Sequence, residues 1–171
     1  MIKKPSIEEV PAFYQGYVRP LPETGIIDYL GKQTDSFMVW LSGLTADQQK
    51  WAYADGKWTV AEVVGHIIDT ERVFAFRVMS IARGETGALP GFDQNAYVEQ
   101  GRFNERDFRS LVDEFEFLRQ SNLVMLKSLD DQAIANTGNA NGTTMSLCTI
   151  VYIMAGHLNH HMNIFKEKYK L

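Results

Sequence analysis

Hydrophobic residues along the chain recur at steps of three and four positions, and no stretch shows a convincing alternation of apolar and polar residues. Such steps place apolar side chains on one face of an α-helix, whereas a half-buried strand would show a period of two. Four long segments have the helical pattern: residues 24–44, 59–84, 105–129 and 144–169. Four amphipathic helices in one chain predict an all-α protein that forms a four-helix bundle.

The segments between these helices have the composition of turns and loops. Thr59 and Glu62 have the spacing of a capping box at the start of the second helix, and Gly84 ends that helix. Residues 84–104 and 136–144 are rich in turn-forming residues and are predicted to be loops, the first of them unusually long. Residues 1–22 are predicted to be a leader containing one short helix, and residues 23–171 a single domain.

The composition is that of an ordinary globular protein. Of 171 residues, 45% are hydrophobic and 22% are charged, and the net charge is −4. No cluster of Lys and Arg is visible, so neither a nucleic acid nor an anionic membrane is expected as a partner. The longest nearly apolar stretch, residues 147–158, is well short of the roughly 20 residues that a membrane span needs.

The cysteine content and the N-terminus predict a compartment. Cys148 is the only cysteine, so no intramolecular disulfide can form, and this usage is typical of a reducing environment. The first residues reach proline and glutamate before any apolar run, unlike a secretory signal peptide. A cytoplasmic location is therefore expected.

Three of the four histidines stand at positions where the helical repeat calls for hydrophobic residues. His157 and His161 are four residues apart, so both imidazoles project from one face of the last helix, and His66 has a similar position on the second. A buried imidazole without a partner costs about 1–3 kcal/mol. Neutral imidazole is a good ligand for Zn²⁺ and Ni²⁺, so the trio predicts one divalent-metal site. The alternative is that each is a hydrogen-bonded core residue. His160 lies about 100° around the helix from His161 and is expected to face solvent or support the site.

Two charged residues follow His66 on nearly the same helical face. Asp69 is a candidate catalytic residue, since it could orient an imidazole, act as a base or bind the metal. The alternative for Asp69 is a surface ion pair with Arg72. Arg77 could meet an anionic substrate, but the favoured interpretation is an arginine that is solvated or paired within the protein.

Three motifs resemble one known family. Residues 57–72 (KWTVAEVVGHIIDTER), 90–95 (PGFDQN) and 155–161 (AGHLNHH) are similar to motifs of the DinB-like superfamily, in its YfiT-type branch. The resemblance implies a four-helix bundle, often a homodimer, with Zn²⁺ or Ni²⁺ on three histidines, which by motif position are His66, His157 and His161. Members of the family are described as metal-dependent hydrolases, and some relatives are transferases or isomerases that use low-molecular-weight thiols.

These observations predict a metal-dependent enzyme that acts on a small molecule. Three protein ligands leave positions on the ion open, as in catalytic sites. The resemblance favours a transferase that uses a low-molecular-weight thiol, with a hydrolase as a close variant. Two alternatives remain open: a non-catalytic metal-binding or stress-related bundle protein, and a purely structural bundle whose histidines belong to the core.

Overall fold

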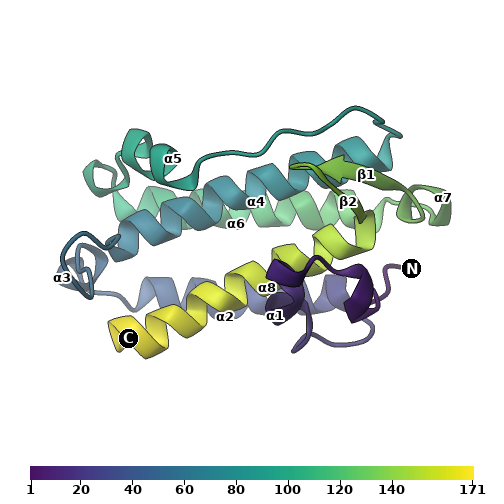
Figure 1. The fold of residues 1–171 in the computed structure, drawn as a ribbon. Coiled ribbons are helices and arrows are strands. Elements are labelled where there is room, and N and C mark those ends of the chain that lie inside the picture. Colours follow the sequence, from purple (N-terminus) through teal and green to yellow (C-terminus); the bar gives the residue numbers. More distant parts are fainter.

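Four long helices lie side by side in the computed structural model, which describes residues 1–171 (Figure 1). They are α2 (Ile26–Ser42), α4 (Val60–Ala82), α6 (Phe108–Lys127) and α8 (Leu147–Ile164). Helix α4 packs against α6 and α8, and α2 packs against the same two helices from the other side. The predicted all-α class and the four-helix bundle are thus confirmed.

Short elements complete the chain. They are η1 (Ile7–Glu9), η2 (Ala12–Tyr14), α1 (Gln15–Val18), α3 (Ala46–Gln49), α5 (Gln94–Gly101), η3 (Phe103–Glu105), α7 (Asp131–Ile134), β1 (Thr137–Ala140), β2 (Thr143–Ser146) and η4 (Phe165–Tyr169), a π-helical turn that continues α8. No helix combines the length and the apolar character that a membrane span requires.

The two helices that carry the histidines begin at side-chain caps. The Thr59 hydroxyl accepts a hydrogen bond from the Glu62 amide at 3.2 Å, and the Glu62 carboxylate accepts one from the Thr59 amide at 2.7 Å. This reciprocal pair satisfies amides that have no partner within the helix. Helix α8 begins at a one-way cap, in which the Ser146 hydroxyl accepts from the Thr149 amide at 3.0 Å.

A β-hairpin occupies residues 137–146, where the sequence predicted a loop over residues 136–144 followed directly by the last helix, and no strands. Strands β1 and β2 pair antiparallel, and Asn141 and Gly142 at the turn both have positive φ angles, of 54° and 78°. An Asn-Gly pair favours this kind of tight turn because both residues tolerate the left-handed region. The strands are only four residues long, which is too short for a period-two pattern to be visible.

The predicted long loop at residues 84–104 also contains regular structure. Asp93 caps α5, accepting hydrogen bonds from the amides of Asn95 and Ala96. Before α5 the chain runs back along α4 (Figure 1). There the Leu89 amide donates to the Asn139 carbonyl at 2.8 Å, and the Asn141 amide donates to the Leu89 carbonyl at 2.9 Å. The hairpin therefore holds this connection in place.

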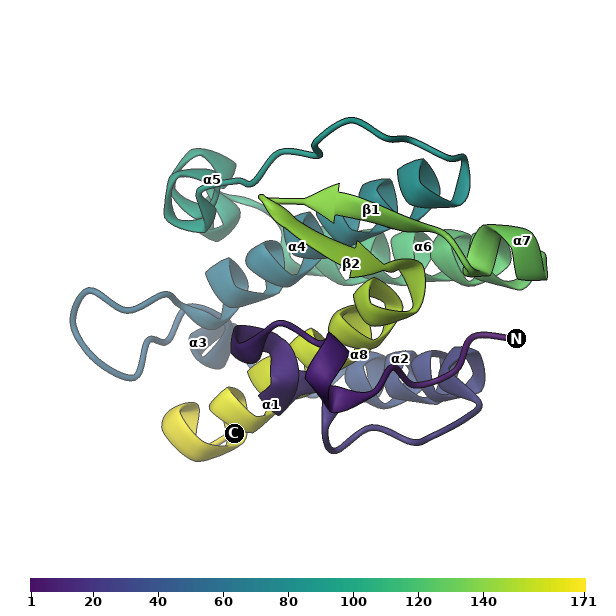
Figure 2. The same cartoon turned by 45° about the vertical axis from the view of Figure 1, so that its right-hand side comes forward.

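The N-terminal residues pack onto the bundle. Four of their apolar side chains are buried in the core: Ile2, Val10, Val18 and Leu21. Helix α1 crosses α8 (Figure 2), and the crossing is close because residue 156 is glycine. A Cβ atom at Gly156 would lie 2.4 Å from the carbonyl oxygen of Tyr17. This approach brings Tyr17 next to the histidines of α8.

A buried ion pair ties α4 to α6. The Arg119 guanidinium donates to both carboxylate oxygens of Glu71, at 2.8 and 3.0 Å, and both side chains are almost fully buried. Asn122 donates to the same carboxylate at 2.9 Å. Arg119 also donates to Gln33 of α2, whose amide donates to Asn159 of α8. The network therefore connects all four long helices.

Candidate metal centre

The three predicted histidines meet where α4 and α8 pack together. The Nε2 atom of His157 lies 3.1 Å from Nε2 of His66 and 3.1 Å from Nε2 of His161. One ligand atom from each residue can be chosen so that all three lie within 4.8 Å of one another. All three side chains are buried, and residues 66 and 157 are 91 positions apart.

Burial keeps these imidazoles neutral at ordinary pH. Loss of hydration lowers the pKa of His66 to about 4 and that of His161 to about 3, with smaller contributions from neighbouring histidines. The pKa of His157 is lowered well below its usual value for the same reasons. A neutral imidazole has one nitrogen with a free lone pair, which is the form that binds metals.

Hydrogen bonds within the protein cannot account for the close approach of these three Nε2 atoms. A neutral imidazole has one N–H and one acceptor nitrogen, so a single Nε2 atom of His157 cannot form good hydrogen bonds to two other Nε2 atoms. A cation at the common point would accept a lone pair from all three rings. Two nitrogens bound to Zn²⁺ at about 2.0–2.1 Å in tetrahedral geometry lie about 3.3 Å apart, close to the 3.1 Å observed. The three histidines therefore fit a divalent metal ion.

The remaining ring nitrogens have unequal surroundings. The Thr70 hydroxyl lies 3.4 Å from Nδ1 of His66, one helical turn along α4. A hydroxyl there can accept the Nδ1 proton and so leave Nε2 of His66 free for the metal. Nδ1 of His161 is buried and has no hydrogen-bond partner. The Thr70 contact was not anticipated from the sequence, although its four-residue spacing from His66 is visible there.

A cavity of about 250 Å³ opens beside the three histidines. Aromatic rings form much of its wall, with Trp58 centred 5.0 Å from His66 and Phe74 centred 5.8 Å from His157. The Tyr17 ring is centred 5.0 Å from that of His160, and both residues line the cavity. The full lining comprises Phe13, Tyr14, Tyr17, Trp58, His66, Thr70, Phe74, Arg77, Phe92, Gln94, His157, His160 and His161. It includes no aspartate or glutamate.

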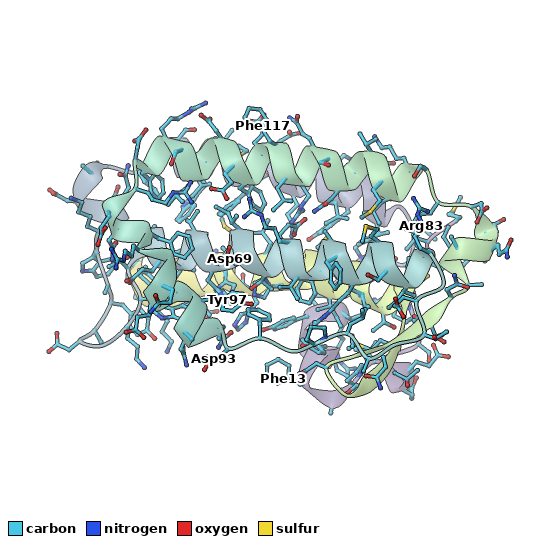
Figure 3. The ribbon with its side chains drawn as sticks, turned by 90° about the horizontal axis from the view of Figure 1, so that it is seen from above. Phe13, Asp69, Arg83, Asp93, Tyr97 and Phe117 are labelled. Atoms are coloured by element: carbon cyan, nitrogen blue, oxygen red, sulfur yellow. The ribbon has the colours of Figure 1, made fainter.

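Asp69 is not among the residues that line this cavity. Its carboxylate lies 3.8 Å from the Arg72 guanidinium, which also contacts Glu114 of α6 at 2.6 Å. Partial burial raises the pKa of Asp69 above its ordinary value. Figure 3 shows its position near the middle of α4. The structure thus places Asp69 near Arg72, the ion-pair arrangement that the sequence offered as the alternative, and outside the lining of this cavity.

The sequence of the chain matches the family model of the DinB superfamily over residues 29–165. The chain belongs to the DinB superfamily. The curated proteins that were compared with it gave no match.

Solved structures of similar fold include two proteins with described activities. YfiT from Bacillus subtilis, described as a "probable metal-dependent hydrolase with an unusual four-helix bundle topology", has 20% identity and a TM-score of 0.73, covering 98% of this chain and 91% of that one. A mycothiol-dependent maleylpyruvate isomerase has 14% identity and a TM-score of 0.68, covering 84% of this chain. This DinB-superfamily chain spans only 60% of the isomerase.

The lowered pKa values predict a metal affinity that changes little with pH. Protons compete with a metal for imidazole only below the pKa of the folded protein, which is about 4 for His66 and about 3 for His161. Three histidines with ordinary pKa values near 6.5 would together lose about 10⁴-fold in affinity between pH 7 and pH 5.

For this protein we expect a loss of less than about tenfold over the same interval. Equilibrium dialysis against a fixed concentration of free zinc, followed by metal analysis, measures it. Circular dichroism at both pH values verifies that the protein stays folded. A loss above about 100-fold would contradict the burial of the three rings.

Proposed function

We propose that this chain is a metal-dependent enzyme in which His66, His157 and His161 hold one divalent ion, Zn²⁺ or Ni²⁺. The observation that carries the proposal is the convergence of three buried, neutral imidazoles on one point in the wall of a cavity. Sites with three protein ligands leave positions for an exogenous ligand, which is the arrangement of catalytic rather than structural metal sites.

The residues around the site have distinct tasks. Thr70 orients His66 through its Nδ1 atom. The aromatic walls give an apolar body a surface to pack against. When bound at these three histidines, a divalent ion would supply Lewis acidity and so lower the pKa of a thiol or a water molecule at the site.

The composition of the cavity favours a thiol over water as the nucleophile. A free thiol has a pKa near 8.5, whereas that of water is near 15.7, so the thiol needs much less activation. Hydrolysis benefits from a general base beside the water, and no carboxylate lines this cavity. In the proposed reaction a low-molecular-weight thiol releases its proton to solvent, and its sulfur forms a bond to a carbon of the electrophile. The bond from that carbon to the leaving group breaks, and its electron pair departs with the leaving group.

The comparisons support this class of reaction but do not identify the substrate of this chain. YfiT is described as a "probable metal-dependent hydrolase", and the isomerase as mycothiol-dependent. These two descriptions correspond to the two reaction types that an ion with open positions supports, hydrolysis and thiol chemistry. Hydrolysis is accordingly the second candidate function.

The proposal is tested with protein purified without a histidine tag. We expect about one divalent ion per chain by elemental analysis after metal supplementation. The metal-loaded protein should conjugate cysteine or glutathione to monochlorobimane faster than the uncatalysed reaction, and chelation should abolish the difference. A metal-loaded protein that is inactive in thiol and ester panels would indicate a non-catalytic metal-binding protein. A metal content near zero would remove the proposal.

A further inference from the structure

Arg77 lies in the same cavity as the three histidines. His66, Thr70, Phe74 and Arg77 follow one another at steps of four, four and three residues, which places them on one face of α4. The Cα atom of Arg77 is about 16 Å from that of His66 along the helix axis. Side chains on a helix generally lean towards its N-terminus, which for Arg77 is the direction of the histidines.

The Arg77 side chain is buried and only partly hydrogen-bonded. It is 4% exposed, and its Nη2 atom donates to the carbonyl oxygen of Pro90 at 2.9 Å. Its Nε atom is buried and has no partner. Of the two arrangements favoured from the sequence, the guanidinium is not solvated, and its partner within the protein is a backbone carbonyl on the connection before α5 rather than an anion.

The second buried arginine of the chain shows what a purely structural arginine needs here. Arg119 is fully buried and donates to both oxygens of Glu71. Arg77 forms no salt bridge, and no aspartate or glutamate lines its cavity. Burying a cation without an anion is costly, and the cost is offset when an anion binds beside it. We therefore infer that a bound ligand supplies the anion that pairs with Arg77.

The shape of the cavity indicates which anion fits. Phosphate sites usually combine several cations or a row of backbone amides. Here a single guanidinium with a free Nε–H stands among Phe74, Phe92 and Tyr14. A planar carboxylate on an apolar body matches one planar guanidinium with aromatic neighbours.

We propose that Arg77 binds the carboxylate of the small molecule that occupies this cavity, and that the ligands of the site are carboxylates with an apolar body. The Pro90 carbonyl holds the guanidinium in place, and the histidines lie at the other end of the bound molecule. As a statement about the substrate class this rests on the proposed function. The carboxylate belongs either to the electrophile or to the thiol.

The test compares an acid with its neutral amide. Isothermal titration calorimetry of zinc-loaded and metal-free protein measures the binding of phenylacetate and phenylacetamide. We expect phenylacetate to bind about 10- to 100-fold tighter, the effect of a charged hydrogen-bonded pair. The Arg77→Met variant should lose this preference in both forms of the protein.

Two further variants separate the local effect from charge and folding. Arg83→Met removes an exposed arginine at the end of the same helix (Figure 3) and should keep the preference. Arg77→Lys retains the charge but not the planar fork, and should keep part of it. This variant, with circular dichroism, keeps the test decisive if Arg77→Met does not fold.

The outcomes distinguish this proposal from the metal site. A preference for the acid that survives in metal-free wild-type protein and is lost in the Arg77 variants supports the proposal whether or not the protein is an enzyme. A preference that needs the metal and survives in Arg77→Met would mean that the carboxylate binds the ion, and would overturn it. Equal affinities for acid and amide, or no measurable binding of the acid, would also overturn it.

A competition arm identifies the source of the carboxylate. Phenylacetate binding is measured with saturating mercaptoethanol and with saturating mercaptopropionate. Displacement by mercaptopropionate alone supports a carboxylate on the thiol. Simultaneous binding of phenylacetate and either thiol supports a carboxylate on the electrophile. Equal displacement by the neutral mercaptoethanol would contradict a role for Arg77.

Discussion

The His157→Ala variant is expected to lose at least about 100-fold in affinity for Zn²⁺ or Ni²⁺. Loss of a residue that merely supports a metal ligand costs 10- to 100-fold, so loss of a ligand itself sets a higher minimum. His157 is the central member of the trio, since its Nε2 atom is 3.1 Å from those of both His66 and His161. Without it only two protein ligands remain. Elemental analysis after dialysis against micromolar zinc measures the loss.

His160→Ala is the matched control for this experiment. His160 is on the same helix and lines the same cavity, but it is not one of the three converging residues. It should retain the metal. Thermal unfolding adds an independent readout, because an ion that binds only the folded state raises the melting temperature. Added zinc should stabilise the wild-type and His160→Ala proteins and leave His157→Ala unchanged. Equal responses of all three would indicate that the histidines are core residues.

The Glu71→Ala variant is expected to lower the free energy of unfolding by about 3–5 kcal/mol. The substitution leaves the Arg119 guanidinium, 0% exposed, as a buried cation without its anion. It also removes the acceptor of the Asn122 amide. A cost of this size is a large part of the stability of a typical domain. Urea unfolding followed by circular dichroism measures it.

Two comparisons show whether the cost comes from the unpaired charge. Asp113→Ala breaks the exposed pair between Arg109 and Asp113, and should cost less than about 1 kcal/mol. Replacing both members of the buried pair, Glu71→Leu with Arg119→Met, should recover much of the stability that Glu71→Ala loses, because no uncompensated charge remains. A double variant that is less stable than Glu71→Ala would mean that the pair contributes net stability through its geometry.

Several features followed from the sequence because they depend on neighbouring residues. Helical periodicity, the Thr59–Glu62 capping box and the positions of the four long helices are local properties. The three histidines were noticeable for the same reason, since each interrupts an apolar repeat. Motifs at residues 57–72, 90–95 and 155–161 indicated the DinB superfamily, and the match over residues 29–165 confirms it.

Short elements could not be predicted in the same way. Helix α5 and the strands β1 and β2 are too short for their hydrophobic pattern to be distinct. The Asn141–Gly142 turn was a usable signal, because this pair favours a hairpin. Hydrogen bonds between Leu89 and the hairpin hold the connection at residues 84–93 in its conformation. No local sequence pattern indicates these hydrogen bonds.

The sequence by itself determined where the long helices lie, which face of each is buried, and which histidines share a face. Only the tertiary structure decided that His66 meets His157 across 91 residues, that Asp69 turns to Arg72, and that Arg77 is enclosed without an anion. The physical reason is the distance along the chain over which each effect acts. Helical periodicity and capping act over one or two turns of chain, whereas the environment of a buried charge depends on which helices pack together.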